Sequence, residues 1–577
     1  MLKIIKLFNN KQKKTFFLLI GLISIASILE MTSLAIIVPI INSFLEIQTT
    51  AKEIDFLWFT SFFDEKHLTL LNFLIFFLFF FVIKSIFSIF VSWKHYNFVI
   101  NFIKELSFNL YSKYLSQHYK SYQSKNSSEL LRNILKEIDY FYLYLMSFIQ
   151  IILELIVLLG ITFFLLYLLF KPTLIVIILS LIFACLYYFL VKKKIISWGK
   201  SRQNAEKDRI RFMQEGFSSI KEINFFKRNS FFTNRFKFKN NEFYTYLFYF
   251  NFFNTLPRFI FELFTVLIIA LIFIFLLSIG KPNEEIIKIL AIFFVASFRI
   301  IPSIYRIVGG LQKLRYANIS LEIIYADINT LGTKKISINT SKLDFRNQIN
   351  LKVSEYIHTK NNSFKIKNID LQIKKNQKIG IIGRSGSGKS TIIDMFSGII
   401  ADKEIKLSVD NFSINEEKKY ADWQSLIGLI PQNISVLNET FRQNILFGLS
   451  DKVISDKDII NTIKISNLTN LMARLPNGID QKISEKGSNL SGGEIQRIGI
   501  ARALIFNPEI LIFDEATSSL DTFTENEILN DINSLENKTI LMISHRMNTL
   551  KFCDKIYLVD NGKIIDEGPY SKFKDKY

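Results

Sequence analysis

The chain has 577 residues, of which 49% are hydrophobic and 15% are aromatic, and its mean hydropathy is +0.25. This length exceeds that of one domain, and this composition excludes an ordinary water-soluble protein, so membrane spans are expected. The formal net charge of +20 suggests nucleic acid as a partner. The lysines, however, stand at the ends of apolar segments, where they face anionic lipid, and we therefore expect no nucleic-acid partner.

Six long apolar segments occupy the first half of the chain. The first follows a lysine-rich start and continues past Glu30 to Phe44, which is too long for a signal peptide, so we expect a retained span. The other five are expected at residues 68–91, 142–170, 173–191, 248–279 and 286–308. Lys and Arg are concentrated at the N-terminus and in segments 94–140 and 192–246, whereas the 46–67 link is acidic. The positive-inside tendency therefore places both termini of this multi-pass protein in the cytoplasm.

A change in composition divides the chain into parts. The first part is dominated by Phe, Leu and Ile, and the last alternates short strands with helices and holds most of the glycines. We expect a multi-domain membrane protein with an all-α transmembrane domain at 1–320, a linker at 321–345 and an α/β domain at 346–577. Segments 94–140 and 192–246 have helical periodicity, so they are expected to continue the spans as helices and to turn where the α/β domain can reach them.

The α/β domain is expected to bind a nucleotide through a glycine-rich loop. This loop consists of Gly383, Arg384, Ser385, Gly386, Ser387, Gly388, Lys389, Ser390 and Thr391. It follows an apolar strand at 378–382 and precedes a helix at 392–400, which is the context that a P-loop needs. Glycines let consecutive N–H groups turn towards a phosphate, and the helix N-terminus favours the same anion. Lys389 is expected to reach the β- and γ-phosphates, and Ser390 is expected to bind Mg²⁺.

Further polar residues follow other predicted strands. The apolar strand 510–513 ends in Asp514 and Glu515, Gln432 follows Pro431, and His545 follows a strand at 539–543. Beside a P-loop, Asp514 is expected to hold the Mg²⁺ shell and Glu515 to polarise the attacking water. Gln432 is suited to contact both the metal and the water. His545 is suited to contact the γ-phosphate.

A second glycine turn opens a helix and completes a recognisable set of motifs. Its residues are Ser491, Gly492, Gly493 and Glu494, and their backbone can approach another anion. Together with the P-loop, this set resembles the nucleotide-binding domain of ABC transporters over residues 346–577. The resemblance implies ATP hydrolysis coupled to transport, ATP and Mg²⁺ as cofactors, and a nucleotide contact from Asp521 in the D-loop. The aromatic residue that stacks on adenine stays open between Tyr356 and His358.

The resemblance also implies an assembly. In this family the glycine turn of one domain covers the nucleotide held by the P-loop of another. This chain holds one set of motifs after six spans, which is typical of a half-transporter of the type 1 exporter class. We therefore expect a homodimer with two equivalent ATP sites.

Ionisable residues inside the expected spans bear on the cargo, because charges there are costly and usually mark a pathway. These residues are the cations Lys84, Arg258, Arg299 and Arg306 and the carboxylates Glu30, Glu154 and Glu262. Arg299 and Arg306 are seven residues apart, which places them on one helical face. The cations are expected either to pair with the carboxylates or to form a basic lining for a phosphate or pyrophosphate.

A closer resemblance concerns the stretch 298–307 and the run 487–493, which are similar to those of PglK-type flippases. These ABC transporters move lipid-linked oligosaccharides for bacterial protein glycosylation. The resemblance implies a polyprenyl-pyrophosphate-linked glycan that moves from the inner to the outer leaflet of the bacterial cytoplasmic (inner) membrane, with the pyrophosphate engaged by the cations named above. The aromatic stretch 56–63 is expected as an interface anchor, or as a short helix that touches the polyprenyl tail. The alternative function is a general exporter of lipids of the lipid A type or of amphiphilic drugs.

Overall fold

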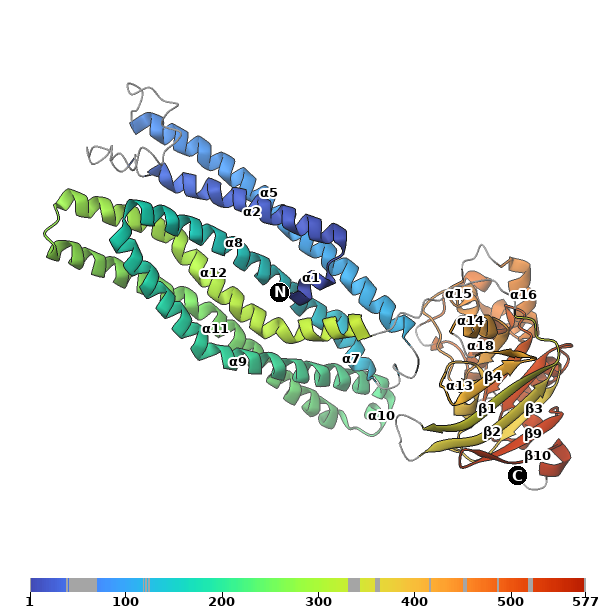
Figure 1. The fold of residues 1–577 in the computed structure, drawn as a ribbon. Coiled ribbons are helices and arrows are strands. Elements are labelled where there is room, and N and C mark those ends of the chain that lie inside the picture. The colour runs from blue at the N-terminus through green and yellow to red at the C-terminus, as the bar shows by residue number, and fades with distance from the viewer. Residues whose placement is uncertain are drawn as a thin grey trace. The chain divides into compact units, whose positions relative to one another are not determined.

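The computed structural model describes residues 2–37, 40, 70–117, 119, 122, 125–330, 343–357, 364–414, 417–449, 454–484, 487–516 and 522–574. They belong to two compact units, one helical and one α/β (Figure 1). The aromatic stretch 56–63 lies outside the described residues.

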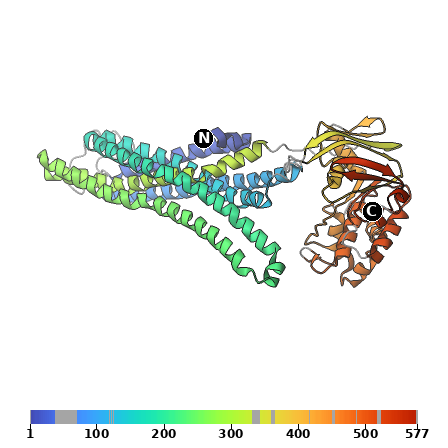
Figure 2. The ribbon, with the colours of Figure 1, turned by 90° about the horizontal axis from the view of Figure 1, so that it is seen from below.

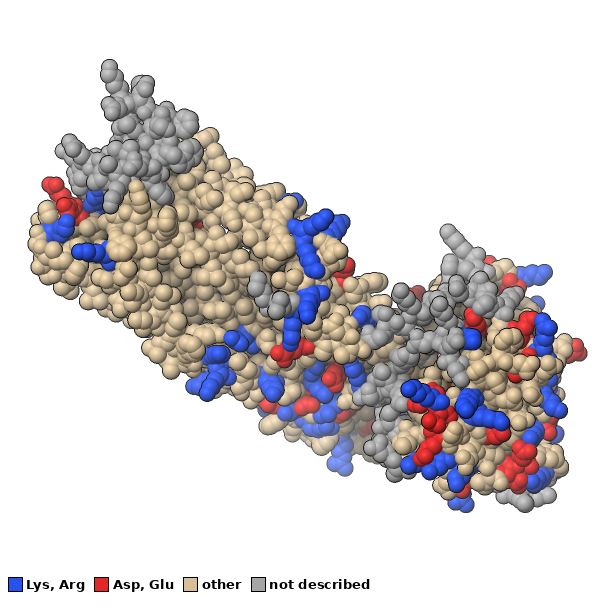
Figure 3. Space-filling view, in the orientation of Figure 1, with Lys and Arg blue, Asp and Glu red and all other residues tan. Residues whose placement is uncertain are grey.

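The helical unit is built from long helices. Its elements are α1 (Leu2–Leu7), α2 (Asn10–Ala35), α5 (Leu70–Ser116), α7 (Ser127–Arg132), the π-helix η3 (Asn133–Glu137), α8 (Ile138–Leu168), α9 (Phe170–Ser218), α10 (Ile220–Phe225), α11 (Asn229–Ser278) and α12 (Asn283–Thr330). Within the described residues, six helices are long and apolar enough to cross a membrane, which confirms the six predicted spans. On the face seen in Figure 3, a broad surface of this unit is uncharged, as contact with lipid requires.

The long helices extend well past the apolar segments. α9 continues to Ser218 and α11 begins at Asn229, so most of segment 192–246 consists of the ends of these two helices. They lie side by side up to the turn that joins them (Figure 2). α12 likewise continues to Thr330, so the first ten residues of the expected linker are helical; its buried side chains Leu321, Ile324 and Asp327 hold it against the unit. Residues 331–342 lie outside the described residues.

A close approach of α8 and α12 organises the centre of the helical unit. A Cβ atom at Gly310 would lie 2.7 Å from Cγ1 of Ile151, so any other residue at this position would displace the Ile151 side chain. Asn254 of α11 donates from Nδ2 to the carbonyl oxygen of Gly309 at 3.0 Å. The glycine pair thus brings α8, α11 and α12 together at one level.

The α/β unit holds two sheets. An antiparallel sheet has the order β2-β1-β4-β5, and a mostly parallel sheet has the order β10-β9-β3-β8-β7-β6. The strands are β1 (Gln348–Ile357), β2 (Lys365–Lys374), β3 (Lys378–Ile382), β4 (Ile405–Val409), β5 (Phe412–Ser413), β6 (Ile427–Ile430), β7 (Ile510–Asp514), β8 (Thr539–Ile543), β9 (Lys555–Asp560) and β10 (Lys563–Gly568). The larger helices are α13 (Lys389–Phe396), α14 (Glu417–Ser425), α16 (Asp456–Ile465), α18 (Gly492–Leu504) and α19 (Thr522–Asn533).

The parallel strands explain where a site can form. β7 and β8 are almost continuously apolar and buried, as expected for a parallel sheet covered on both faces. β3, β6, β7 and β8 run parallel, so their carboxyl ends meet at one edge of the sheet. Ligands bind at this edge in open α/β sheets. The structure confirms the predicted fold class, a region of six membrane-spanning helices followed by an α/β domain.

The buried thiol of Cys553 gives a test of this core. Burial, with a smaller contribution from the charge of Asp554, raises the pKa of Cys553 to about 12. Since only the thiolate reacts, we expect maleimide labelling at pH 8 to be about 10³-fold slower in the folded protein than in denaturant. The measurement uses a Cys185→Ser background, so that Cys553 is the single thiol. Fast labelling of the folded protein contradicts the burial of this residue.

Candidate functional site

The glycine-rich loop between β3 and α13 has a backbone that other residues cannot easily adopt. Gly386 and Gly388 have φ angles of +80° and +104°, in the left-handed region that favours glycine. A Cβ atom at Gly383 would lie 2.1 Å from the carbonyl oxygen of Val559. The loop is therefore a tight turn whose N–H groups precede the N-terminus of α13.

Lys389 lies across this loop. Its Nζ atom donates to the carbonyl oxygens of Gly383 and Arg384, both at 2.9 Å. Burial lowers the pKa of Lys389, while the charges of Glu515 and Asp514 oppose that shift. The Ser387 hydroxyl is buried and has no hydrogen-bond partner in the described part of the chain. A buried ammonium and an unsatisfied hydroxyl beside turned N–H groups fit a phosphate.

The structure brings the predicted metal and catalytic residues together at the carboxyl ends of the parallel strands. Ser390 donates from Oγ to Asp514 Oδ1 at 3.2 Å, and Gln432 donates from Nε2 to Glu515 Oε2 at 2.9 Å. His545 Nδ1 lies 3.8 Å from Glu515 Oε1. Hydroxyl, carboxylate and amide oxygens are ligands that Mg²⁺ prefers, so this donor set fits the metal.

The electrostatics of this edge favour a cation. Burial raises the pKa of Asp514; the charge of Glu515 adds to the shift, and the hydrogen bond from Ser390 opposes it. A divalent cation favours the charged form of such a carboxylate. Glu515 has a φ of +49°, an uncommon value for a residue other than glycine. Such backbone outliers cluster at functional sites.

The second glycine turn starts a regular helix. Ser491 is the N-cap of α18, its Oγ accepts from the N–H of Glu494 at 3.2 Å, and Glu494 Oε2 accepts from the N–H of Ser491 at 2.8 Å. Arg474 also contacts the Glu494 carboxylate. The Glu494 side chain is therefore engaged in forming the helix start, whereas the backbone of Gly492 and Gly493 carries no side chain that would block an anion.

Two of the predicted nucleotide contacts, His358 and Asp521, lie outside the described residues. Tyr356 is 4% exposed, because its position in β1 turns the side chain into the core of the α/β unit. In this position the Tyr356 ring offers no open face for stacking. The ring of Phe364 instead lies beside the phosphate loop, since a Cβ atom at Gly388 would be 3.2 Å from its Cζ atom. Sequence reasoning missed Phe364.

A buried carboxylate supports the segment that carries His545. Glu525 accepts from Arg546 Nη1 at 3.1 Å and from Thr549 Oγ1 at 2.8 Å. These bonds tie the chain after β8 to α19. Sequence reasoning missed Glu525, because its partners lie more than twenty residues away. We infer that Glu525 is a positioning residue for His545.

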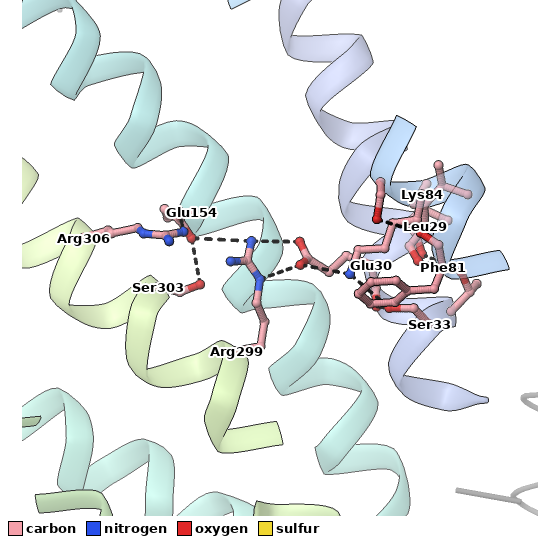
Figure 4. A network of polar contacts seen from close by, with 12 residues as sticks. Leu29, Glu30, Ser33, Phe81, Lys84, Glu154, Arg299, Ser303 and Arg306 are labelled. Carbon is pink, nitrogen blue, oxygen red and sulfur yellow. Dashed lines mark hydrogen bonds and ion pairs between the residues drawn. The ribbon is translucent and has the colours of Figure 1, made fainter. Parts of the chain in front are cut away.

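In the helical unit, charged side chains from four helices form a network (Figure 4). Arg299 of α12 faces Glu30 of α2, with Nε 2.6 Å from Oε1 and Nη2 donating to Oε2 at 2.8 Å. Lys84 of α5 lies 3.5 Å from Glu30 and donates to the Ser33 hydroxyl at 3.4 Å. Glu30 thus joins two cations from different helices.

Glu154 of α8 is the second carboxylate of this network and is fully buried. It accepts from Arg306 Nη1 at 2.9 Å, from the Ser303 hydroxyl at 2.7 Å and from Gln150 Nε2 at 2.9 Å. Arg299 Nη2 lies 3.8 Å from it. Several donors satisfy this buried charge, as its desolvation requires.

Arg258 of α11 pairs with Glu262 at 3.0 Å, one turn along the same helix. All four predicted substrate-binding cations therefore have a carboxylate partner, so the pairing expected as one alternative is present. Arg258 and Arg306 also line a cavity of about 520 Å³ between α5, α8, α11 and α12. Arg306 keeps 41% of its side chain exposed, so its ion pair leaves part of the guanidinium accessible.

Comparison with known proteins identifies both units. The model of the ABC transporter transmembrane region matches residues 16–298, and the model of the ABC transporter domain matches residues 366–518. The solved "Structure of a bacterial Atm1-family ABC exporter with ATP bound" covers 99% of this chain and 97% of that chain with a TM-score of 0.80. The two are 18% identical, so this likeness shows the fold.

Curated relatives are similar over part of their length. The "Putative export ATP-binding/permease protein RP696" of Rickettsia prowazekii is 37% identical over 238 residues, which are 41% of this chain and 39% of that protein. The "ATP-dependent lipid A-core flippase" of Vibrio vulnificus (strain CMCP6) is 31% identical over 232 residues, 40% of each chain. The chain spans about two-fifths of the length of the curated relatives that it matches.

Proposed function

The chain belongs to the ABC transporter family, and from this premise we propose that it hydrolyses ATP to move a polyprenyl-pyrophosphate-linked oligosaccharide between membrane leaflets. The observation that best supports this cargo is the set of arginines beside the cavity of about 520 Å³ within the spans. Arginine forks match the geometry of phosphate oxygens, and charges placed among membrane helices usually serve transport.

In the proposed ATP site, each residue acts from the position described above. The N–H groups of Gly383–Thr391 and the ammonium of Lys389 bind the phosphates. Ser390, Asp514 and Gln432 would hold Mg²⁺, which when bound supplies neutralisation of the phosphate charge. Catalysis of this kind consists of positioning and electrostatic stabilisation.

Glu515 is the proposed catalytic carboxylate, because it stands beside both Gln432 and His545. The amide of Gln432 holds one carboxylate oxygen, which leaves the group oriented to polarise a water molecule. His545 contacts the terminal phosphate. Glu525 keeps the His545 segment in place through Arg546 and Thr549.

We propose that two copies of the chain form the working unit. Ser491, Gly492, Gly493 and Glu494 of each copy, with Asp521, would cover the nucleotide on the P-loop of the other. The open backbone of the α18 N-terminus supports this role. In a bacterial inner membrane, with both termini cytoplasmic, closure around ATP would drive the cargo from the inner to the outer leaflet.

A second candidate cargo is a lipid of the lipid A type. It is favoured by the 31% identity to a protein named as a lipid A-core flippase. Both candidates are anionic glycolipids, so the basic residues at the cavity suit either. The pyrophosphate of the first candidate is what distinguishes them.

Reconstitution tests the proposed function. The purified chain is placed in proteoliposomes with a fluorescent polyprenyl-diphosphate oligosaccharide or with fluorescent lipid A, and exposure of the glycan on the opposite side is followed with and without ATP. We expect ATP-dependent movement of the diphosphate-linked glycan. Movement of lipid A alone supports the second candidate and rejects the first. Hydrolysis without movement of either lipid rejects the flippase function.

A further inference from the structure

We infer that Lys313 is a further substrate-binding residue, and that it gives the cavity a preference for a headgroup with two negative charges. This inference rests on the proposed function and specifies the substrate class of the same cavity. Lys313 lies on α12 seven residues after Arg306, which itself lies seven residues after Arg299. Residues at this spacing follow one face of a helix. The three cations thus form a stripe along α12, and the last two line the cavity.

Ion pairing distinguishes Lys313 from the other members of this stripe. Arg299 and Arg306 pair with Glu30 and Glu154. Lys313 is half-buried, and its ammonium has no ion pair or hydrogen bond within the described part of the chain. Lys313 lies just beyond the expected span at 286–308, but a half-buried cation without a carboxylate is unfavourable in the empty protein, and a bound anion would relieve that cost.

The balance of charge sets the expected ligand. In the network, the cations Lys84, Arg299 and Arg306 face the carboxylates Glu30 and Glu154, which leaves one positive charge. Arg258 is balanced by Glu262. Lys313 adds a second uncompensated charge. Among the residues described as lining the cavity there is no carboxylate, so an anion meets no opposing charge on its walls.

The glycine pair keeps this part of the cavity open. Gly309 and Gly310 lie between Arg306 and Lys313 on α12 and line the cavity without side chains. Asn254 is held by hydrogen bonds to the Gly309 carbonyl and to Gln312 at 3.0 and 3.1 Å. These bonds engage the amide nitrogen of Asn254, and an amide carries no charge that could compensate the Lys313 ammonium. A volume of about 520 Å³ is in the range of small-molecule sites and accommodates a diphosphate with an adjoining sugar.

The two cations of α12 that line the cavity, Arg306 and Lys313, suit two phosphates in different ways. The guanidinium of Arg306 is partly engaged with Glu154 and presents a rigid fork. The ammonium of Lys313 is a compact charge on a flexible stem that can follow a second phosphate. A lipid diphosphodiester carries one charge on each phosphate, whereas a monophosphodiester carries one charge in total. Only the first uses both uncompensated cations.

Direct binding to the full chain in lipid nanodiscs tests this inference. The probes are N-acetylglucosamine linked to farnesyl diphosphate and the same sugar linked to farnesyl monophosphate, titrated without nucleotide. Wild type is expected to bind the diphosphate probe at least about tenfold more tightly. Lys313→Gln is expected to lower the affinity for the diphosphate probe about tenfold and the affinity for the monophosphate probe less than about twofold. Lys313→Arg is expected to retain most of the affinity.

Arg315→Gln is the matched control, because Arg315 lies on the same helix but is exposed and bonded to the Tyr188 hydroxyl at 3.0 Å, away from the cavity lining. It is expected to bind both probes as wild type does. Equal affinities of Lys313→Gln and wild type for the diphosphate probe overturn the inference. An equal loss of affinity for both probes in Lys313→Gln also overturns it. A wild-type protein without preference for the diphosphate overturns it even where Lys313→Gln fails to fold. Failure of wild type to bind either probe rejects the proposed cargo itself.

Discussion

Glu515→Gln is expected to lower ATP hydrolysis about 10²- to 10³-fold while leaving ATP bound. The substitution keeps the size of the side chain and its contact with Gln432, but it removes the charge that polarises the attacking water. Lys389, Ser390 and Asp514 stay in place, so the phosphates and Mg²⁺ keep their ligands. In the proposed homodimer, ATP that is bound but not hydrolysed should hold the two copies together.

The measurement combines steady-state hydrolysis with size-exclusion chromatography in Mg·ATP. Glu509→Gln is the matched control, because Glu509 precedes the same strand but is partly exposed and pairs with Lys375 at 3.3 Å, away from the phosphate loop. That variant should hydrolyse ATP at the wild-type rate. Normal hydrolysis by Glu515→Gln would show that another group activates the water. Loss of ATP binding would instead mean that Glu515 helps to hold the nucleotide.

The phosphate site could be predicted from sequence because its determinants are local. Gly386, Gly388 and Lys389 act through backbone angles and a helix N-terminus that follow within a few residues. The distant members could also be placed, since Asp514 ends one apolar strand and His545 comes two residues after another. A parallel sheet brings such strand ends to one edge without further information.

Features that depend on packing between distant segments could not be predicted in the same way. The inward orientation of Tyr356 depends on which face of β1 is covered, and the alternation of a short strand allows either face. Glu525 looks like an ordinary helix residue until α19 packs against the segment after β8. The helical end of α12 was assigned to a linker because its polar residues obscured the buried positions at Leu321 and Ile324.

The ion network of the helical unit also depends on packing between distant segments, and its arrangement bears on function. The sequence allowed both salt bridges and a substrate lining for Arg299 and Arg306, and the structure contains the salt bridges. The two roles are compatible, because Arg306 is both paired with Glu154 and exposed to the cavity. A carboxylate can hold an arginine in position in the empty protein, and an incoming phosphate can then take up its remaining N–H groups.

Joint replacement of both arginines separates these two roles. Arg299→Ala with Arg306→Ala is expected to lower transport of the diphosphate-linked glycan per ATP hydrolysed about 10²-fold. It also leaves Glu30 with only Lys84 and leaves Glu154, which is fully buried, without a cation. An uncompensated buried charge costs about 3–5 kcal/mol, so the variant should also melt at a lower temperature.

A compensated variant decides which role the arginines have in transport. Adding Glu30→Gln and Glu154→Gln to the double arginine variant removes the unpaired carboxylates, so thermal stability should return towards the wild-type value. If the arginines bind the pyrophosphate, transport stays low, because the cations that engage it are still missing. Recovery of transport together with stability would mean that Arg299 and Arg306 act only to neutralise Glu30 and Glu154. In that case the cargo would have to be recognised by other residues of the cavity.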